Sequence, residues 1–174
     1  INVTTIDIET EYEGGFPQVE VADQKVLAIT IKNNIDGVYH VWGLQDYDTE
    51  KALIKPVNYI KCESEPELLA RFVNHWRQEE NLPDVITGWN VRFFDIPYLI
   101  NRVNRICGVD MVRQFSPWGL IDQRKVRRLN KEEMTYDIKG IQVMDYLELF
   151  QKFGYSYGKQ ESYKLDHIGH VVLG

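Results

Sequence analysis

The N-terminal third of the chain holds four short stretches rich in apolar and β-branched residues, a composition typical of strands. They lie at residues 3–8, 26–31, 38–42 and 57–61. Between the second and third stretches, residues 33–37 have the sequence NNIDG, which favours a turn. We therefore predict a hairpin between these two strands.

The apolar period becomes helical after the fourth stretch. Ser64 and Glu67 form a capping box, a pattern that commonly starts a helix, and apolar residues then recur at helical spacing as far as Trp76. The dipeptide Leu82-Pro83 ends this pattern. We predict one amphipathic helix whose apolar face packs on the strands.

Strand and helix alternate over the middle of the chain. Residues 85–88 (VITG) predict a short strand, and a second helix is expected to begin with Asp95 as its N-cap and to end at Gly108. Two strand-like segments, residues 120–129 and 134–138, then flank the polar sequence NKE and predict a long charged hairpin.

The last part of the chain predicts one more strand and two helices. Residues 141–144 form the strand, and the helix after it carries Leu147 and Phe150 on its apolar face. A terminal helix is expected with Ser162 as its cap and Ile168 on its buried side. Three β-segments followed by alternating strands and helices predict an α/β domain with a mixed sheet flanked by helices.

The overall charge argues against a dedicated duplex-DNA binder. The 174 residues carry a formal charge of −6, although residues 113–139 hold seven basic residues against four acidic ones. No apolar run approaches the ~18 residues of a membrane span, and no signal peptide precedes the first strand. We expect a protein of the cell interior with no membrane partner.

Cysteine usage and the chain ends add two expectations. Cys62 and Cys107 are far apart in the sequence, so neither a disulfide nor a thiolate zinc site is predicted. The chain opens on Ile1 directly in strand-like sequence and stops at Gly174 without a closing signal. We therefore expect one domain taken from a longer protein.

Two carboxylates on the first strand are candidate metal ligands. Asp7 and Glu9 lie two residues apart, so both project from one face of the strand. Like charges this close repel each other unless a cation lies between them, and Mg²⁺ and Mn²⁺ prefer carboxylate oxygens. The alternative is a pair of solvated acids at the end of a sheet, and the spacing alone does not exclude it.

A second candidate site is the connection between the predicted strand 85–88 and the helix after it. Ligands of α/β sheets collect at the ends of strands, where a helix begins. Asp95 lies there, either as a metal ligand or as a plain helix cap. Asn90 is either a ligand contact or a turn residue.

At two places the sequence resembles the first two exonuclease motifs of family B DNA polymerases. These are residues 5–9 (TIDIE) and residues 87–98 (TGWNVRFFDIPY). The similarity continues through residues 101–103, 115–119 and 140–153, which resemble the polymerases of T-even-type bacteriophages in particular. The resemblance covers essentially the whole chain.

The resemblance implies a proofreading exonuclease with an RNase H-like fold of the DEDD type and a β-hairpin insertion at about residues 120–139. Such domains remove misincorporated nucleotides from the 3′ end of a primer by two-metal-ion hydrolysis. The resemblance further implies that Asp7 holds both Mg²⁺ or Mn²⁺ ions, that Glu9 helps bind one ion and orients the attacking water, and that Asp95 ligates the second ion. The implied partners are single-stranded or primer-template DNA and a polymerase domain of the same parent chain, in the cytoplasm of an infected bacterium.

DNA contacts are implied as well. Phe16 matches an aromatic position that stacks on the frayed 3′ nucleotide, and Asn90 and Phe94 are further candidate substrate contacts. The basic hairpin is similar to the element that helps part primer from template and contacts phosphates. Its candidate contacts are Arg124, Lys125, Arg127 and Arg128. The alternatives are a core Phe16 and a hairpin that is merely solvated.

The third motif of the family, Tyr-x-x-x-Asp, does not occur in this sequence. None of the ten Tyr residues has Asp four positions later, although Tyr59 and Tyr157 have Glu there. We expect the motif to lie beyond Gly174, so the chain lacks one carboxylate and its own activity is weak or absent. A non-catalytic single-stranded-DNA-binding module with an exonuclease-like fold is the alternative, and a free-standing RNase H-like nuclease is a third interpretation.

Overall fold

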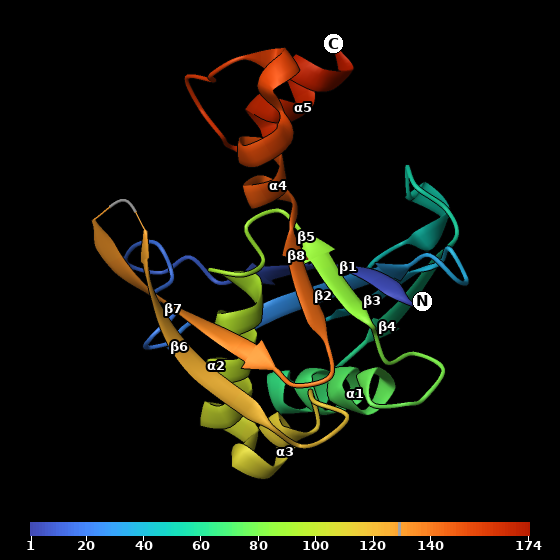
Figure 1. Ribbon diagram of the computed structural model, residues 1–174. Helices are drawn as coiled ribbons and strands as arrows, with labels where there is room; N and C mark the ends of the chain where they lie inside the picture. Colours follow the sequence, from blue (N-terminus) through green and yellow to red (C-terminus); the bar gives the residue numbers. More distant parts are fainter. Residues whose placement is uncertain (129) are drawn as a thin grey trace.

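A six-stranded mixed sheet organises the computed structural model, which describes residues 1–128 and 130–174 (Figure 1). Its strands are β1 (Val3–Thr10), β2 (Val26–Asn33), β3 (Tyr39–Gly43), β4 (Val57–Lys61), β5 (Val85–Gly88) and β8 (Gln142–Asp145), in the order β4-β3-β2-β1-β5-β8. The central strand β1 pairs antiparallel with β2 and parallel with β5. The antiparallel pairing of β2 with β3 confirms the predicted hairpin.

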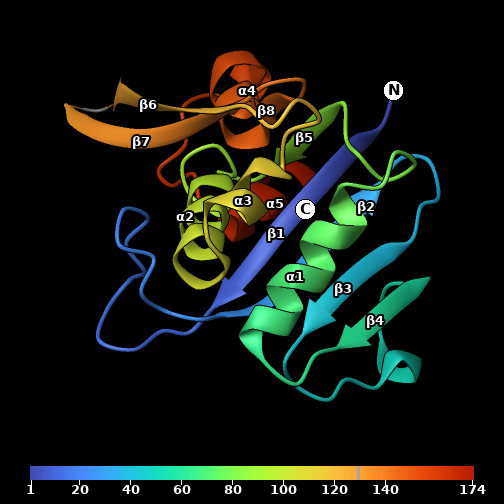
Figure 2. The same cartoon turned by 90° about the horizontal axis from the view of Figure 1, so that it is seen from below.

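Helices cover the sheet unevenly. They are α1 (Glu65–Trp76), α2 (Asp95–Cys107), α3 (Val109–Arg113), α4 (Tyr146–Phe153) and α5 (Leu165–Leu173), with single 3-10 turns at Thr49–Lys51 and Tyr155–Tyr157. Helices α1 to α3 lie together below the sheet in Figure 1, whereas α4 and α5 stand apart from them at the top. The view from below in Figure 2 shows α1 lying over the sheet between β1 and β3, and α1 contacts β2 and β3.

The core lies between the sheet and the two long helices. Ile6 and Ile8 of β1 point into it, and Leu68, Phe72 and Trp76 of α1 pack against the sheet from one side. Further core residues come from β2, β3, β5 and α2: Ile29, Ile31, Trp42, Ile86, Ile96, Leu99 and Val103. Because side chains alternate along a strand, this burial leaves Asp7 and Glu9 on the opposite, exposed face of β1.

The predicted charged hairpin forms a separate two-stranded sheet of β6 (Ile121–Arg128) and β7 (Lys131–Ile138). Its turn is tighter than we predicted, since β7 begins at Lys131 and not at Met134. The longer ladder brings acidic residues of β7 near basic residues of β6, and such cross-strand pairs favour it: Glu132 lies 3.7 Å from Lys125 and Glu133 lies 3.8 Å from Arg128. Asn130 adopts a left-handed conformation (φ 63°), which allows the tight turn. Leu129, which we assigned to the first of these strands, lies outside the described residues.

The starts of α1 and α5 show one confirmed cap and one wrong one. Ser64 Oγ accepts the N–H of Glu67 at the start of α1, as the capping box predicts. The start of α5 differs, because Lys164 occupies its N-cap position without a side-chain cap. Ser162 lies too early for this role and accepts the N–H of Lys164 in a local turn instead. Within the described part of the chain, no helix is both long and apolar enough to cross a bilayer.

Candidate active site

The exposed face of β1 presents the first two candidate carboxylates. Asp7 and Glu9 both lie on this face near the C-terminal end of the strand. The side chain of Asp7 is accessible to solvent but partly surrounded by protein, and this partial burial raises its pKa above the ordinary value. The nearby charge of Glu9 raises the same pKa further. The two acids therefore repel each other across the strand face, as the sequence predicts for such close spacing.

Asp95 joins this pair from a different element. The predicted cap is wrong here, because Phe94 occupies the N-cap position of α2 and Asp95 is the first helical residue. Its Oδ1 instead accepts the backbone N–H of Ile8 at 3.0 Å. Pairing between β1 and β5 stops at Thr5, so this N–H lies beyond the ladder and needs another acceptor. The carboxylate of Asp95 supplies it, and the side chain is only 4% exposed.

The electrostatics of Asp95 follow from this position. Burial raises the pKa of Asp95 to about 7, and the charge of Asp7 contributes in the same direction. Among the described residues, neither acid forms an ion pair with a basic side chain. Such uncompensated carboxylates match the oxygen ligands that Mg²⁺ and Mn²⁺ prefer. In the described residues, however, no three His, Cys, Asp or Glu side chains form a group that could hold a metal ion.

The loop from β5 to α2, residues 88–95, has a constrained backbone. Gly88 lies so close to β1 that an added Cβ would stand 2.7 Å from the carbonyl oxygen of Ile6, so only glycine fits. Asn90 takes a left-handed conformation (φ 62°) and its carbonyl accepts the N–H of Phe94. The structure thus supports the turn interpretation of Asn90, and no side-chain hydrogen bond of Asn90 occurs within the described residues.

Asp145 is a residue of this region that our sequence reasoning missed. It ends β8 and is 2% exposed. Its carboxylate accepts three backbone N–H groups, from Asn90 at 3.0 Å, Arg92 at 2.9 Å and Leu147 at 2.8 Å. An Asp between a predicted strand and a predicted helix is the available sequence signal, because Asp is a preferred N-cap.

Three further contacts fix the same loop from other sides. Thr135 of β7 donates its hydroxyl to the carbonyl of Arg92 at 3.0 Å. The side chain of Arg92 forms an ion pair with Glu148 of α4 at 3.1 Å. The indole N–H of Trp89 donates to the carbonyl of Tyr163 at 3.1 Å. The loop that carries Asp95 is therefore held by the hairpin, by α4 and by the segment before α5.

An aromatic row leads from the surface to α2. Phe16 is 72% exposed, so it is not the core residue of the alternative interpretation. Its ring centroid lies 5.3 Å from that of Phe94, and the ring of Phe94 lies 5.6 Å from that of Tyr98. Phe94 directly precedes Asp95 in the chain, so the exposed ring of Phe16 contacts the residue next to a candidate carboxylate.

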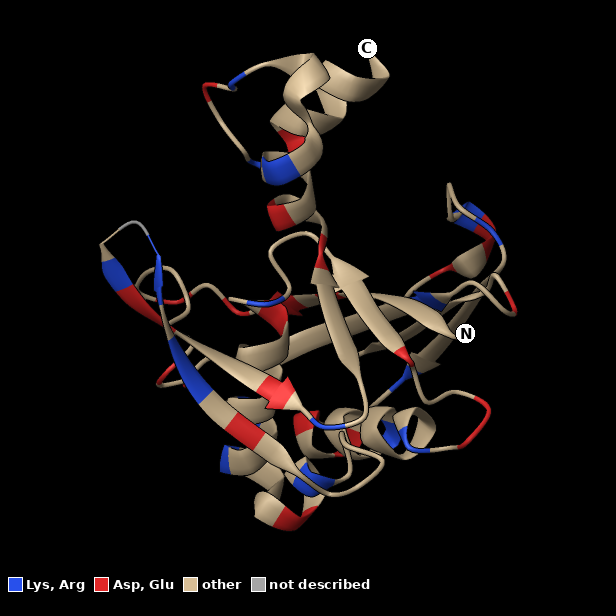
Figure 3. Cartoon of the chain, viewed as in Figure 1, with Lys and Arg blue, Asp and Glu red and all other residues tan. Residues whose placement is uncertain are grey.

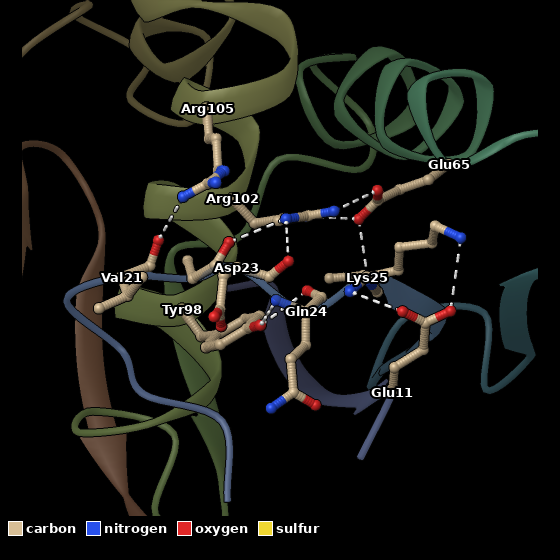
Figure 4. A network of polar contacts seen from close by, with 11 residues as sticks. Glu11, Val21, Asp23, Gln24, Lys25, Glu65, Tyr98, Arg102 and Arg105 are labelled. Atoms are coloured by element: carbon tan, nitrogen blue, oxygen red, sulfur yellow. Dashed lines mark hydrogen bonds and ion pairs between the residues drawn. The ribbon is translucent and has the colours of Figure 1, made fainter. Parts of the chain in front are cut away.

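The loop that carries Phe16 is anchored to α2 by a buried polar network (Figure 4). The guanidinium of Arg102 forms two 2.7 Å hydrogen bonds with the carboxylate of Glu65 and also donates to the carbonyl of Ala22 at 2.9 Å. The Tyr98 hydroxyl donates to the carbonyl of Gln24 at 2.7 Å. Helix α2 thus positions both Asp95 and the loop before β2.

The hairpin cations are largely paired within the hairpin. Figure 3 shows basic and acidic segments alternating along β6 and β7. The pairs are Arg124 with Asp137 at 2.6 Å, Lys125 with Glu132 at 3.7 Å and Arg128 with Glu133 at 3.8 Å. Arg127 forms no such pair with any described residue, and it lines a groove of about 450 Å³ with Lys152 of α4.

Comparison with known proteins identifies relatives that match most of the chain. Residues 1–168 match the family described as DNA polymerase family B, exonuclease domain. The DNA-directed DNA polymerase of Escherichia phage RB69 is 31% identical over 99% of this chain and 21% of its own length. That of Enterobacteria phage T4 is 28% identical over 90% of this chain and 20% of its own length. The DNA polymerase delta catalytic subunit of Caenorhabditis elegans is 28% identical over 67% of this chain and 11% of its own length. The chain spans about a fifth of the two phage relatives.

Proposed function

The chain belongs to the exonuclease domains of family B DNA polymerases, and on that premise we propose that it removes nucleotides from the 3′ end of single-stranded or frayed primer DNA. We propose an RNase H-like fold of the DEDD type, with β6 and β7 as a hairpin insertion. The two phage relatives support a polymerase domain in the same parent chain and action in the cytoplasm of an infected bacterium.

The proposed cofactors are two Mg²⁺ or Mn²⁺ ions, since exonuclease domains of this family generally use divalent metal ions. Asp7, Glu9 and Asp95 would hold them. When bound, such ions activate water and neutralise the charge that develops on the scissile phosphate and the leaving 3′ oxygen. The hydrogen bond from Ile8 orients the Asp95 carboxylate beside β1. Burial, and secondly the charge of a neighbouring acid, raises the pKa of both Asp7 and Asp95, and a bound cation would favour their ionised forms.

The proposed substrate contacts follow the aromatic row and the hairpin. The exposed ring of Phe16, backed by Phe94, offers a surface on which the terminal base stacks, a contact worth ~1 to 3 kcal/mol per base. Asn90 lies on the same loop as Asp95. Among the hairpin cations Arg127 is the strongest candidate for a phosphate contact, because the other three have acidic partners at 2.6–3.8 Å.

One observation carries the proposal. The contact between Asp95 Oδ1 and the Ile8 N–H joins residues 87 positions apart, one from each motif-like segment, at a distance of 3.0 Å. Two segments that resemble consecutive motifs of one active site therefore meet in space through a direct hydrogen bond. A solvated acid pair and a plain helix cap do not require this meeting.

The second candidate is a module that binds single-stranded DNA without cleaving it. One observation favours it: the described residues contain no cluster of three metal-ligating side chains. Binding would then use the Phe16 ring and the hairpin, and the carboxylates would be structural.

Degradation of a 5′-labelled single-stranded oligonucleotide by the 174-residue chain in Mn²⁺ distinguishes the two. We expect slow shortening from the 3′ end, because one carboxylate of the family pattern is missing from the sequence. Asp7→Asn is expected to reduce this rate ~100-fold or more, since it removes a proposed ligand of both ions.

The matched control is Asp110→Asn, which removes an exposed carboxylate on α3 and should leave the rate unchanged. Equal rates for the wild-type chain and Asp7→Asn would contradict the proposed exonuclease. Retention of the oligonucleotide without any shortening would favour the binding module.

A further inference from the structure

The carboxylate of Asp145 bridges two elements at the candidate site. Oδ1 accepts the N–H of Asn90 and that of Leu147, and Oδ2 accepts the N–H of Arg92. The bond to Leu147 caps α4, as an ordinary N-cap does. The bonds to Asn90 and Arg92 cross to the loop between β5 and α2, 55 and 53 residues earlier in the chain, and helix capping does not require them.

These two crossing bonds act on the part of the loop that determines where Asp95 lies. Asn90 holds the left-handed turn, and its carbonyl then accepts the N–H groups of Phe93 and Phe94 immediately before Asp95. A left-handed Asn is less favourable than an ordinary backbone conformation and persists where its surroundings over-determine it. The neighbouring strands supply a fixed base, because Gly88 and Asp145 pair directly in the β5–β8 ladder.

We propose that Asp145 is a positioning residue for the exonuclease site, which holds the loop of residues 88–95 so that the Asp95 carboxylate stays beside Asp7. The proposal rests on the proposed function. Asp145 does not itself need to touch metal or substrate, because both of its oxygens are engaged by backbone N–H groups and its side chain is 2% exposed. Residues that orient metal ligands commonly alter metal affinity 10- to 100-fold when they are replaced.

The variant Asp145→Asn distinguishes the proposed positioning of the 88–95 loop from the capping of α4. Asn is as good an N-cap as Asp, so the start of α4 is preserved. The amide has one acceptor oxygen and one NH₂ group, so it cannot accept the N–H of Arg92 and those of Asn90 and Leu147 together. If the amide oxygen keeps accepting the N–H groups of Asn90 and Leu147, the NH₂ group of the variant faces the N–H of Arg92. Two hydrogen-bond donors then face each other, and the bond to Arg92 is lost.

The first measurement is amide hydrogen exchange of the full 174-residue chain without metal. We expect exchange at Asn90 and Arg92 to become at least tenfold faster in Asp145→Asn, while the amides of α4 keep their protection. Ser64→Ala is the matched control, since it removes a cap hydrogen bond from α1, away from the site. It should leave Asn90 and Arg92 unchanged.

The second measurement is the affinity of the same chains for Mn²⁺ alone. We expect Asp145→Asn to bind Mn²⁺ about tenfold more weakly than the wild type, and Ser64→Ala to bind it equally well. Asp145→Ser, which also caps α4 but offers a single hydroxyl oxygen, should show the same two effects and replaces the Asn variant if that variant does not fold.

Two results would overturn the proposal. Unchanged exchange at Asn90 and Arg92 in both Asp145 variants would mean that the crossing bonds do not hold the loop. Loss of Mn²⁺ binding with unchanged exchange would make Asp145 a metal ligand and not a positioning residue. Asp7→Asn, measured alongside, reports on the proposed function separately, because its loss of Mn²⁺ binding and cleavage does not depend on Asp145.

Discussion

At the scale of single residues, the charge of Asp95 links pH to stability. Burial raises its pKa to about 7 from an ordinary 3.8, so the folded chain holds a proton that the unfolded chain releases. The contribution of this group to stability is therefore full below about pH 4 and is lost as the pH rises to about 7. Asp95→Asn removes the titration but keeps an oxygen for the Ile8 N–H. Between pH 5 and pH 8 we expect the free energy of unfolding of the variant to fall less than that of the wild type, by on the order of 2 kcal/mol.

Urea unfolding at the two pH values measures this difference. Asp110→Asn, which removes an exposed carboxylate, should follow the wild type. Mn²⁺ should stabilise the wild-type chain more at pH 8 than at pH 5, because a cation favours the ionised carboxylate. Parallel pH profiles for the wild type and Asp95→Asn would contradict the raised pKa.

The roles of the candidate site residues differ in how well they could be predicted from the sequence. The alternation of side chains along a strand is enough to place Asp7 and Glu9 on one face. Asp95 has the local pattern of a helix cap, and its real partner, the N–H of Ile8, is free only because β5 ends early. Asp145 has no local feature beyond that of a cap, since its two distinguishing hydrogen bonds come from a distant loop. Long-range pairing of this kind is not encoded in any short window of sequence.

At the scale of elements, the buried pair of Arg102 and Glu65 joins α2 to α1. Both side chains are 6% exposed, and breaking such a pair leaves a buried charge without compensation. We expect Arg102→Met to lower the free energy of unfolding by ~3 kcal/mol, and Glu65→Met in the same chain to recover part of that loss. A double-mutant cycle in urea measures the coupling.

The matched control is Arg71→Met, because Arg71 forms an exposed ion pair with Glu67 at 2.9 Å on α1. Such pairs contribute less than ~1 kcal/mol, so the control should be nearly neutral. Strictly additive effects of the two buried substitutions would show that Arg102 and Glu65 do not stabilise the fold as a pair.

Element type was predictable where the periodicity was strong. The four N-terminal strands, the helix after Ser64 and the mixed sheet follow from β-branched stretches, a capping box and the order of segments. The turn of the charged hairpin was placed too late, because Lys131 and Glu132 are polar and read as loop. In the structure they are strand residues, since each faces a residue of β6 across the ladder. Backbone pairing across the ladder extended the strand through these polar residues, although Lys131 faces the like-charged Arg128.

At the scale of the whole molecule, the net charge does not show which basic side chains are free to contact a phosphate. The chain carries −6, and the basic residues of the hairpin are mostly paired with acids. Arg127 has no acidic partner among the described residues, so it is the hairpin cation most available to a phosphate. We expect Arg127→Gln to weaken single-stranded DNA binding and to reduce the slope of log affinity against log salt by about one.

Fluorescence anisotropy with a labelled oligonucleotide over a range of salt concentrations measures this slope. Arg77→Gln is the matched control, because Arg77 follows α1 and makes its side-chain contact with Asn74. An unchanged slope in Arg127→Gln would exclude a phosphate contact at this position.

The hydrogen bond from Thr135 to the carbonyl of Arg92 couples the position of the hairpin to that of the loop that carries Asp95. A substitution that shifts β7 can therefore shift the loop through this bond, whether or not the hairpin contacts DNA. Lower cleavage in a hairpin variant therefore does not by itself demonstrate a role in separating strands. Substitutions far from Thr135, such as those near Asn130, report on DNA contact, whereas substitutions beside Thr135 also report on the geometry of the carboxylates.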